Sequence, residues 1–367
     1  MSFNDSKRIV IKIGSALIAP SNNGCSSHNL LAIAQFIVKC RENGQQVILV
    51  SSGSVAAGRK WFDAKELTTT LKKAMAATGQ TDMMELWDKL FDFPTAQLLL
   101  TNDDLCHRDR YLSIKDTLEA CLEHKVLPVV NENDTVTSDD RKVGDNDNLA
   151  AMVATAVNAN VLVMCTDVNG LYDKNPHTDS SAQLIQEVST INANTYKMAG
   201  GAVSITGTGG MRTKIEAAEK ATSHGIDTYI INAFDTNSFT RLLANKNPGT
   251  HFVAQKQPVS HAVHWMTHTS KARGELIVDE STMDEGDIQD NLTSNNLVAV
   301  NGEFSVGDTI VVKNDDGKRL AKATTNYSSC LLNHLADKGI REKLDDDSSL
   351  LNHSIVSNEH IAVLGGK

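Results

Sequence analysis

Along the first two-thirds of the chain, short apolar runs rich in Val and Ile alternate with segments in which apolar residues recur every three or four positions. The short runs predict buried strands, and the periodic segments predict amphipathic helices. Near-continuous apolar strands separated by helices are typical of a mostly parallel sheet that is sandwiched by helices, so we predict an α/β fold. The predicted strands are residues 8–13, 47–50, 126–130, 161–165 and 228–231.

Two of the intervening helices have recognisable ends. One is expected to be capped by Ser27 and to end before Gly44, because serine suits a helix start and glycine suits the position just past a helix end. The other is expected from Ser113 to Glu123, where apolar residues recur at helical spacing. Each helix would bury one apolar stripe against the sheet.

The pattern changes after about residue 255. Residues 256–270 are polar and include Pro258, which predicts a linker between two domains. Beyond it, short strand-like runs are separated by turns rich in Gly, Asn and Asp, which predicts a small β-rich domain. We therefore expect a catalytic domain over residues 1–255, a linker over 256–270 and a second domain over 271–367. The strand-like runs of that second domain are residues 274–278, 297–300 and 307–312.

Polar clusters follow several of the predicted strands. Open α/β sheets bind ligands beyond the carboxyl ends of their strands, so we expect these clusters to share one crevice. They are Lys12 to Gly14, Ser52 with Gly53, Asn131 to Asp134, and Thr166 with Asp167.

Two further segments favour phosphoryl transfer. Residues 145–148 place two carboxylates and two carboxamides immediately before an apolar helix, which suits a small-molecule site better than a core. Residues 207–214 form a glycine-rich turn that enters a helix carrying Lys214, and such turns bind phosphate through backbone N–H groups and the helix dipole. Each segment also has a structural alternative. Residues 145–148 would then be solvated polar residues of a loop, and residues 207–214 would be an ordinary surface turn. Taken together, they predict an enzyme that moves a phosphoryl group onto a small polar acceptor.

Composition narrows the protein class. The 367 residues are 41% hydrophobic and 22% charged, as in ordinary globular proteins. No run approaches the roughly 20 apolar residues that span a bilayer, and the first residues show no signal-peptide pattern. The six cysteines form no C-x-x-C pair, which fits reduced thiols, so we expect a cytoplasmic protein. The net charge is −10, and residues 271–367 carry 10 Lys and Arg against 17 Asp and Glu. This balance argues against general nucleic-acid binding.

Other motifs are missing from the sequence. It contains no Walker A motif and no G-x-G-x-x-G after the first strand, which disfavours P-loop kinases and dinucleotide enzymes. The histidines have no metal-ligand spacing, so we assign none to a metal. A carboxylate acceptor has a pKa of about 4.3 and is already a nucleophile at pH 7, so no general base is required. Such an enzyme needs lysines, backbone N–H groups and Mg²⁺ to neutralise the moving charge.

In their order and spacing, these motifs resemble the amino-acid kinase family and, within it, the glutamate 5-kinases. The tail resembles a PUA domain. Aspartokinases, acetylglutamate kinases and uridylate kinases share the fold but not this combination of motifs. The segments that carry the resemblance are residues 11–15, 51–59, 131–134, 144–149, 166–172 and 207–214.

The resemblance implies ATP-dependent phosphorylation of the γ-carboxyl of L-glutamate to L-glutamyl 5-phosphate, the first step of proline biosynthesis. It implies catalytic roles for Lys12, Asp147 and Lys214. The glutamate-binding residues would be Ser52, Gly53, Asp134, Asp145 and Asn146. The ATP-binding residues would be Lys12, Gly14, Thr166, Asp167, Thr208, Gly209, Gly210, Met211, Arg212, Thr213 and Lys214.

The resemblance also implies ATP and Mg²⁺ as cofactors, feedback inhibition by proline, a homotetramer, and transfer of the labile product to glutamyl-phosphate reductase, with no membrane partner. The last strands of a PUA domain usually carry a glycine where Ala323 stands here. Together with the acidic tail, this difference argues against RNA binding. Two alternatives stay open: an RNA-binding or regulatory module built on the tail, and a kinase of the same fold with a different acceptor.

Overall fold

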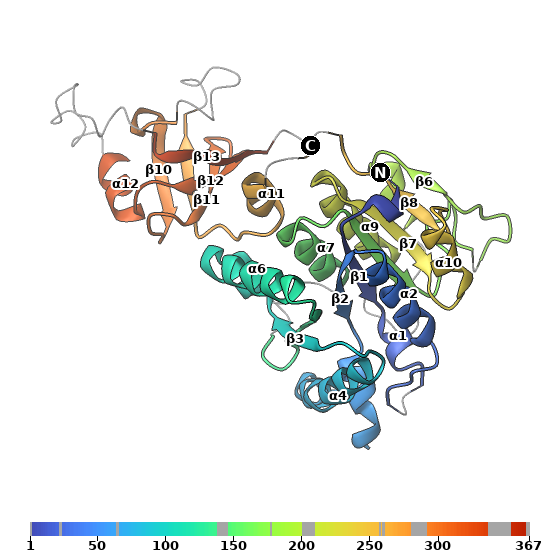
Figure 1. The fold of residues 1–367 in the computed structure, drawn as a ribbon. Coiled ribbons are helices and arrows are strands. Elements are labelled where there is room, and N and C mark those ends of the chain that lie inside the picture. Colours follow the sequence, from blue (N-terminus) through green and yellow to red (C-terminus); the bar gives the residue numbers. More distant parts are fainter. Residues whose placement is uncertain are drawn as a thin grey trace. The chain divides into compact units, whose positions relative to one another are not determined.

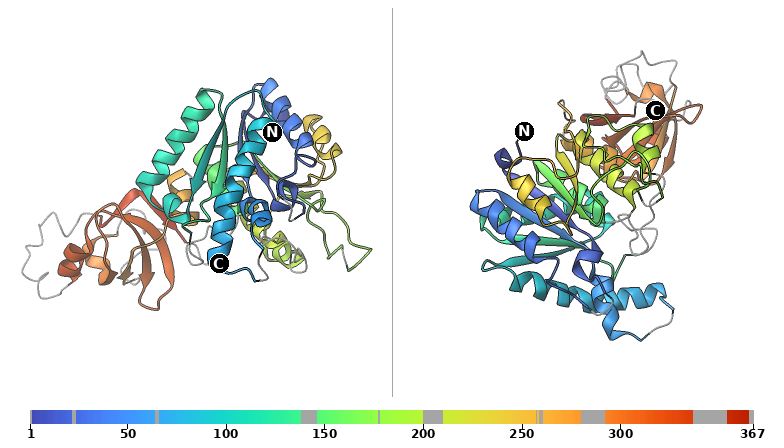
Figure 2. Two further views of the ribbon diagram at one scale, coloured as in Figure 1. Left: turned by 90° about the horizontal axis from the view of Figure 1, so that it is seen from below. Right: turned by 90° about the vertical axis from the view of Figure 1, so that its right-hand side faces the viewer.

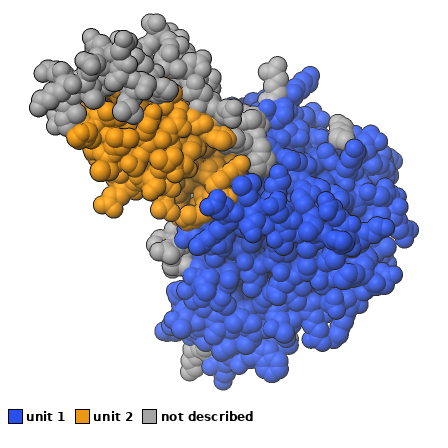
Figure 3. Space-filling view, turned by 60° about the vertical axis from the view of Figure 1, so that its left-hand side comes forward, with its two compact units in different colours: residues 1–105, 109–258 blue, residues 106–108, 259–367 orange. Residues whose placement is uncertain are grey.

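The computed structural model describes residues 2–21, 24–63, 66–137, 146–176, 178–199, 210–256, 258, 261–279, 292–336 and 354–364. The chain divides into two compact units, shown in Figure 3. The first comprises Met1–Leu105 and Asp109–Pro258, and the second comprises Cys106–Arg108 and Val259–Lys367. The stretch 256–270, which we expected as a linker, contains helix α11 (His261–His268). Among the described residues, no helix is long and apolar enough to cross a membrane.

The described part of the first unit is built on one eight-stranded sheet in the order β3-β4-β2-β1-β5-β7-β8-β6. Every pairing in it is parallel except that of β7 with β8, which confirms the predicted mostly parallel sheet. The strands are β1 (Arg8–Ile13), β2 (Gln46–Ser51), β3 (Thr95–Leu100), β4 (Leu127–Glu132), β5 (Val161–Thr166), β6 (Glu187–Val188), β7 (Asp227–Asn232) and β8 (Thr250–Phe252).

Helices lie on both faces of this sheet (Figures 1 and 2). Side chains alternate between faces along a strand, so Ile9, Ile11 and Ile13 of β1 face one way and pack in a core with Phe36 of α2 and Phe239 of α10. Helices α7 and α9 pack together on the other face, over β1, β5 and β7. The helices are η1 (Phe3–Asp5), α1 (Ser15–Ile18), α2 (Leu31–Glu42), α3 (Ser54–Gly58), η2 (Arg59–Trp61), α4 (Thr69–Lys89), α5 (Asn102–Cys106), α6 (Arg108–Glu123), α7 (Asn146–Ala156), α8 (Ala193–Met198), α9 (Met211–Ser223) and α10 (Asn237–Leu243).

Two predicted helix starts were wrong. Helix α2 begins at Leu31, and the Ser27 carbonyl instead accepts backbone hydrogen bonds in a preceding turn. Helix α6 begins at Arg108 rather than at Ser113, because a further buried side chain, Tyr111, extends its apolar stripe. Gly44 has a φ of 82° and follows α2, as expected of a glycine past a helix end.

Helix α4 crosses α3 at backbone contact. A Cβ atom on Gly79 would lie 1.9 Å from the carbonyl oxygen of Ser54, and one on Gly58 would lie 1.9 Å from that of Met75. Only glycine fits at either position, since no real Cβ atom comes so close to backbone. The crossing holds α4 against the amino end of α3, and it brings Gln80 into the interior.

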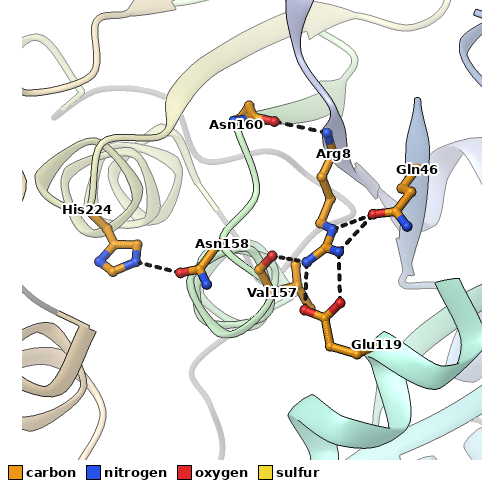
Figure 4. A network of polar contacts seen from close by, with 7 residues as sticks. All are labelled: Arg8, Gln46, Glu119, Val157, Asn158, Asn160 and His224. Atoms are coloured by element: carbon orange, nitrogen blue, oxygen red, sulfur yellow. Dashed lines mark hydrogen bonds and ion pairs between the residues drawn. The ribbon is translucent and has the colours of Figure 1, made fainter. Parts of the chain in front are cut away.

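At the amino end of β1, a polar network joins several elements (Figure 4). The Arg8 guanidinium donates to both carboxylate oxygens of Glu119 on α6, at 2.7 and 2.8 Å, and to Gln46 Oε1 on β2, at 2.9 and 2.7 Å. It also donates to the carbonyl of Val157, which follows the last turn of α7. Asn160 Oδ1 accepts from the Arg8 backbone N–H at 3.0 Å. The carboxyl-terminal end of α7 is thereby tied to the sheet.

The second unit contains a five-stranded sheet in the order β10-β9-β11-β12-β13, in which β9 and β11 pair in parallel and the other pairs are antiparallel. This agrees with the predicted smaller β-rich domain. Two of its strands, β12 and β13, were missed because lysine, threonine and other polar residues interrupt their apolar positions. The elements are β9 (Gly274–Val278), η6 (Ser294–Asn296), β10 (Leu297–Gly302), β11 (Thr309–Asn314), β12 (Arg319–Thr325), α12 (Ser329–Ala336) and β13 (Val356–Val363).

Candidate functional site

The first turn of α7 holds a buried carboxylate between two lysines. Asp147 is 0% exposed, and its Oδ1 lies 2.6 Å from Lys12 Nζ while its Oδ2 lies 3.0 Å from Lys214 Nζ. Lys12 comes from β1 and Lys214 from the first turns of α9, with exposures of only 7% and 6%. Thr213 Oγ1 donates to the same Oδ2 at 3.1 Å. Three elements far apart in sequence therefore meet at one carboxyl group.

The electrostatics of this cluster favour an anionic ligand. Burial alone would raise the pKa of Asp147, but attraction to Lys12 and Lys214 outweighs burial and lowers that pKa to about 2. Asp147 is thus ionised at neutral pH. Two ammonium groups share this one carboxylate, so they keep donor capacity for a further anion, since each ammonium has three N–H bonds.

A second polar cluster extends from the neighbouring residue of α7. Asn146 Nδ2 donates to Ser52 Oγ at 2.6 Å and to Asn131 Oδ1 at 3.0 Å. Asn131 Nδ2 donates in turn to Gln80 Oε1 at 2.9 Å. The chain of contacts joins the carboxyl ends of β2 and β4 to α7 and α4. Asn146 Oδ1 is buried and has no hydrogen-bond partner among the described residues. Buried polar atoms are usually hydrogen-bonded, so this oxygen is suited to accept a hydrogen bond from a ligand.

Beside this cluster, two predicted residues border the start of α3. Ser54 Oγ donates to Asp134 Oδ2 at 3.0 Å. Gly53 precedes α3 with a φ of 114°, and a Cβ atom there would lie 2.8 Å from Ile18 Cβ. Glycine is therefore required at this turn for both its conformation and its small size. The turn exposes backbone rather than a side chain to the polar cluster.

One of the predicted nucleotide residues, Met211, lines an apolar pocket. Thr166 is the last residue of β5 and Asp167 follows it, and the Thr166 hydroxyl donates to the Asp167 carboxylate at 3.1 Å. Gly210 precedes α9 and, as a glycine, has no side chain with which to cap this helix start. Residues that line the pocket include Val168, Gly170, Leu171, Tyr172, Met198 and Met211. Met211 and Lys214 both lie on the first turns of α9, so the pocket and the Lys12–Asp147–Lys214 cluster share that helix.

The structure places Arg212 on the exposed side of α9, where its Nε lies 3.2 Å from Glu216 Oε1. Gly14 precedes α1 with ordinary backbone angles. Asp145, Thr208 and Gly209 lie outside the described residues.

The chain is similar to known proteins. Residues 7–232 match the model of the Amino acid kinase family. The matched range contains strands β1 to β7 of the first unit. The chain belongs to the amino acid kinase family. It is 55% identical over 364 residues to glutamate 5-kinase 1 of Pseudoalteromonas translucida, with 98% of each chain covered. It is 51% identical to glutamate 5-kinase of Idiomarina loihiensis, with 90% of each chain covered. An isopentenyl phosphate kinase structure aligns at a TM-score of 0.48 and 18% identity, covering 67% of this chain and 100% of that one.

In this amino acid kinase chain, sequence reasoning missed Gln80 in the polar cluster and Ser54 beside it. Gln80 lies on α4, which was not predicted, because its apolar residues are spread around the helix and Gly79 interrupts it. Ser54 stood within a quoted motif, but nothing in the sequence indicated that it would face Asp134. Both positions depend on the α3–α4 crossing, which is a tertiary contact.

Proposed function

We propose that this protein phosphorylates the side-chain carboxylate of L-glutamate with ATP, which yields L-glutamyl 5-phosphate and begins proline biosynthesis. One observation carries the proposal: the Lys12–Asp147–Lys214 cluster shares the first turn of α7 with the polar cluster and the first turns of α9 with the apolar pocket. A phosphoryl donor and a small polar acceptor bound in these two places would meet at the lysines. The names of the relatives at 55% and 51% identity support glutamate as the acceptor.

The chemistry requires little of the protein beyond positioning and charge. The acceptor carboxylate is ionised at neutral pH and attacks the terminal phosphorus of ATP directly. A bond forms between a carboxylate oxygen and that phosphorus, the bond from the phosphorus to the bridging oxygen breaks, and ADP leaves. Lys12 and Lys214 stabilise the charge on the transferred oxygens, and Asp147 orients both lysines.

The remaining residues divide between the two substrates. On the acceptor side, Ser52, Asn146 and Asp134 hold glutamate, and the Gly53 turn lets backbone approach it. On the nucleotide side, the apolar pocket takes the base, Thr166 and Asp167 take polar groups of the nucleoside, and the backbone N–H groups at the start of α9 take phosphate. Asp145, Thr208 and Gly209 complete the two sides by motif match.

A resident Mg²⁺ site does not fit the described residues. Among them, no group of three or more His, Cys, Asp or Glu side chains is placed to hold a metal ion. Both oxygens of Asp147 already contact lysines. Any Mg²⁺ would therefore enter with the phosphates of ATP, and no step of the proposed mechanism passes through a protein-bound ion.

The finer parts of the proposal concern regulation and assembly. Proline shares the α-amino acid group of glutamate, so we place its inhibition at the same polar cluster. The protein would work in the cytoplasm as a homotetramer, and its labile acyl phosphate would pass to a reductase.

Hydroxylamine trapping tests the proposal. The full-length protein is incubated with ATP, Mg²⁺, hydroxylamine and L-glutamate, with and without proline, and hydroxamate is measured. Hydroxamate that requires both ATP and L-glutamate is the expected result, and a decrease with proline would support the regulatory part. Hydroxamate from another carboxylate but not from glutamate would overturn the acceptor assignment and leave the family unchanged.

A further inference from the structure

Gln80 is a buried member of the polar cluster, and only one end of its carboxamide is hydrogen-bonded among the described residues. It lies on α4 at 8% exposure, and its Oε1 accepts from Asn131 Nδ2 at 2.9 Å. Its Nε2 is buried and has no partner among the described residues. A buried donor without a partner costs about 1–3 kcal/mol, so glutamine at this position calls for an explanation.

A backbone group fixes the orientation of all three carboxamides. The Glu132 backbone N–H donates to Asn131 Oδ1 at 2.9 Å, and a backbone N–H can only donate. Asn131 Oδ1 is therefore the acceptor end of that side chain, and its Nδ2 must point at Gln80. The same Oδ1 accepts from Asn146 Nδ2, which turns Asn146 Oδ1 the other way. Reversing any one amide would bring two donors or two acceptors together.

The consequence reaches the proposed acceptor site. Asn146 Nδ2 also donates to Ser52 Oγ at 2.6 Å, so the Ser52 hydroxyl accepts there and keeps its own proton to donate. Asn146 Oδ1 stays available as an acceptor. The cluster thus offers one donor and one acceptor side by side. A carboxylate accepts from the first and an ammonium donates to the second, which is the pair that an α-amino acid carries.

We infer that Gln80 is a positioning residue that selects α-amino acids at the acceptor site. Its Oε1 accepts a hydrogen bond from Asn131 Nδ2, and Asn131 in turn holds the Asn146 carboxamide in one orientation. Asn146 Oδ1 then accepts a hydrogen bond from the ammonium group of the amino acid substrate. Because Gln80 Oε1 must face Asn131 Nδ2, the side chain cannot turn over to give Nε2 a partner, and Nε2 stays unpaired among the described residues. The inference rests on the proposed function, because it names how that acceptor is recognised.

The test compares glutamate with glutarate, which has the same two carboxylates but no ammonium group. Selectivity is the ratio of the Ki of glutarate, measured as a competitive inhibitor, to the KM of L-glutamate. Gln80→Met removes the acceptor for Asn131 at nearly constant volume and should lower this ratio roughly tenfold, the value of one hydrogen bond to a charged group. The KM of ATP should not change.

Two further variants separate positioning from packing. Gln80→Glu keeps an acceptor for Asn131 and should not lower the ratio, since its negative charge repels glutarate, which lacks the ammonium, more than it repels glutamate. Gln45→Leu is the matched control: Gln45 is also buried, and its Nε2 donates to Phe3 O, Ser6 O and Ser6 Oγ at 2.9–3.0 Å, away from the polar cluster. It should leave the ratio unchanged, with any loss confined to the free energy of unfolding.

The possible results are distinct. If Gln80→Met weakens glutamate and glutarate equally, or if Gln80→Glu loses selectivity, the inference is overturned. Should Gln80→Met not fold, Gln80→Glu still decides, because the inference requires that its ratio does not fall below the wild-type ratio. A wild-type enzyme that makes no hydroxamate from L-glutamate would refute the proposed function itself, whereas a failure confined to the variants refutes only the role of Gln80.

Discussion

Replacing Asp147 by asparagine is the sharpest perturbation of the site. The change preserves shape but removes the charge that Lys12 and Lys214 share at 2.6 and 3.0 Å. Water cannot replace it, because both lysines are under one-tenth exposed. Removing one partner of a buried ion pair costs about 3–5 kcal/mol. The asparagine oxygen still accepts from one lysine, so we expect a value near the lower end, about 3 kcal/mol.

Two measurements check this expectation. Urea unfolding should show the loss in the free energy of unfolding, and the variant should stay folded at 25 °C because domains have about 5–15 kcal/mol in total. Hydroxamate formation should fall at least about 100-fold, since about 3 kcal/mol of lost charge positioning corresponds to roughly two factors of ten in rate. The effect should appear in kcat, because Asp147 acts through the lysines on the transferred group rather than on acceptor binding.

The matched control is Glu42→Gln. It removes an exposed ion pair with Lys39 on α2, in which the two atoms lie 2.6 Å apart. Such a pair contributes little, so both stability and turnover should stay near wild type. If Asp147→Asn behaved like this control, the Lys12–Asp147–Lys214 cluster would be neither a stabilising nor a catalytic arrangement, and the proposed mechanism would be wrong.

Two more predictions address the scaffold. Gly79→Ala should lower the free energy of unfolding by about 1–3 kcal/mol despite the better helix propensity of alanine, because the new methyl group overlaps a backbone carbonyl of α3; an unchanged urea midpoint would contradict the crossing. Burial raises the pKa of Asp227, but a hydrogen bond from His251 at 2.8 Å and another from the Ala254 N–H act in the opposite direction and outweigh burial. The pKa of Asp227 therefore lies below its usual value near 3.8. The folded-state pKa is depressed, so this stabilisation is present above about pH 4 and is lost as the pH falls below that value. Asp227→Asn should therefore flatten the acid limb of a plot of unfolding midpoint against pH, and an equally steep limb would count against the pairing.

Much of the sheet could be predicted from sequence because its central strands are apolar on both faces. Residues 8–13 and 161–165 show this pattern clearly, and they form β1 and β5 in the predicted places. Strand β3 was missed because it lies at the sheet edge with half-exposed side chains, and β6 and β8 are only two and three residues long. A strand that is neither buried nor long leaves little pattern in the sequence.

The site divides in the same way. Lys12, Asp147 and Lys214 could be proposed because charged residues beside glycines and apolar strands are chemically conspicuous. Gln80 could not, because glutamine is an ordinary residue in a helix and its significance lies in what Asn131 donates to it. The direction of a hydrogen bond is a property of three-dimensional packing, and no spacing rule encodes it.

The bracing of α7 at Arg8 gives remote residues a mechanical role in the chemistry. The carbonyl of Val157, held by Arg8, and the Asp147 carboxylate are at opposite ends of one helix. At 1.5 Å per residue, the ten steps along the chain from Asp147 to Val157 span about 15 Å. A helix is stiff along its axis, so a fixed far end limits sliding and tilting of the near end. The contacts of Arg8 at the amino end of β1 thus fix the carboxyl-terminal end of α7. In this way the Arg8–Glu119 salt bridge, which no substrate touches, helps to set the spacing between the two lysines and the Asp147 carboxylate.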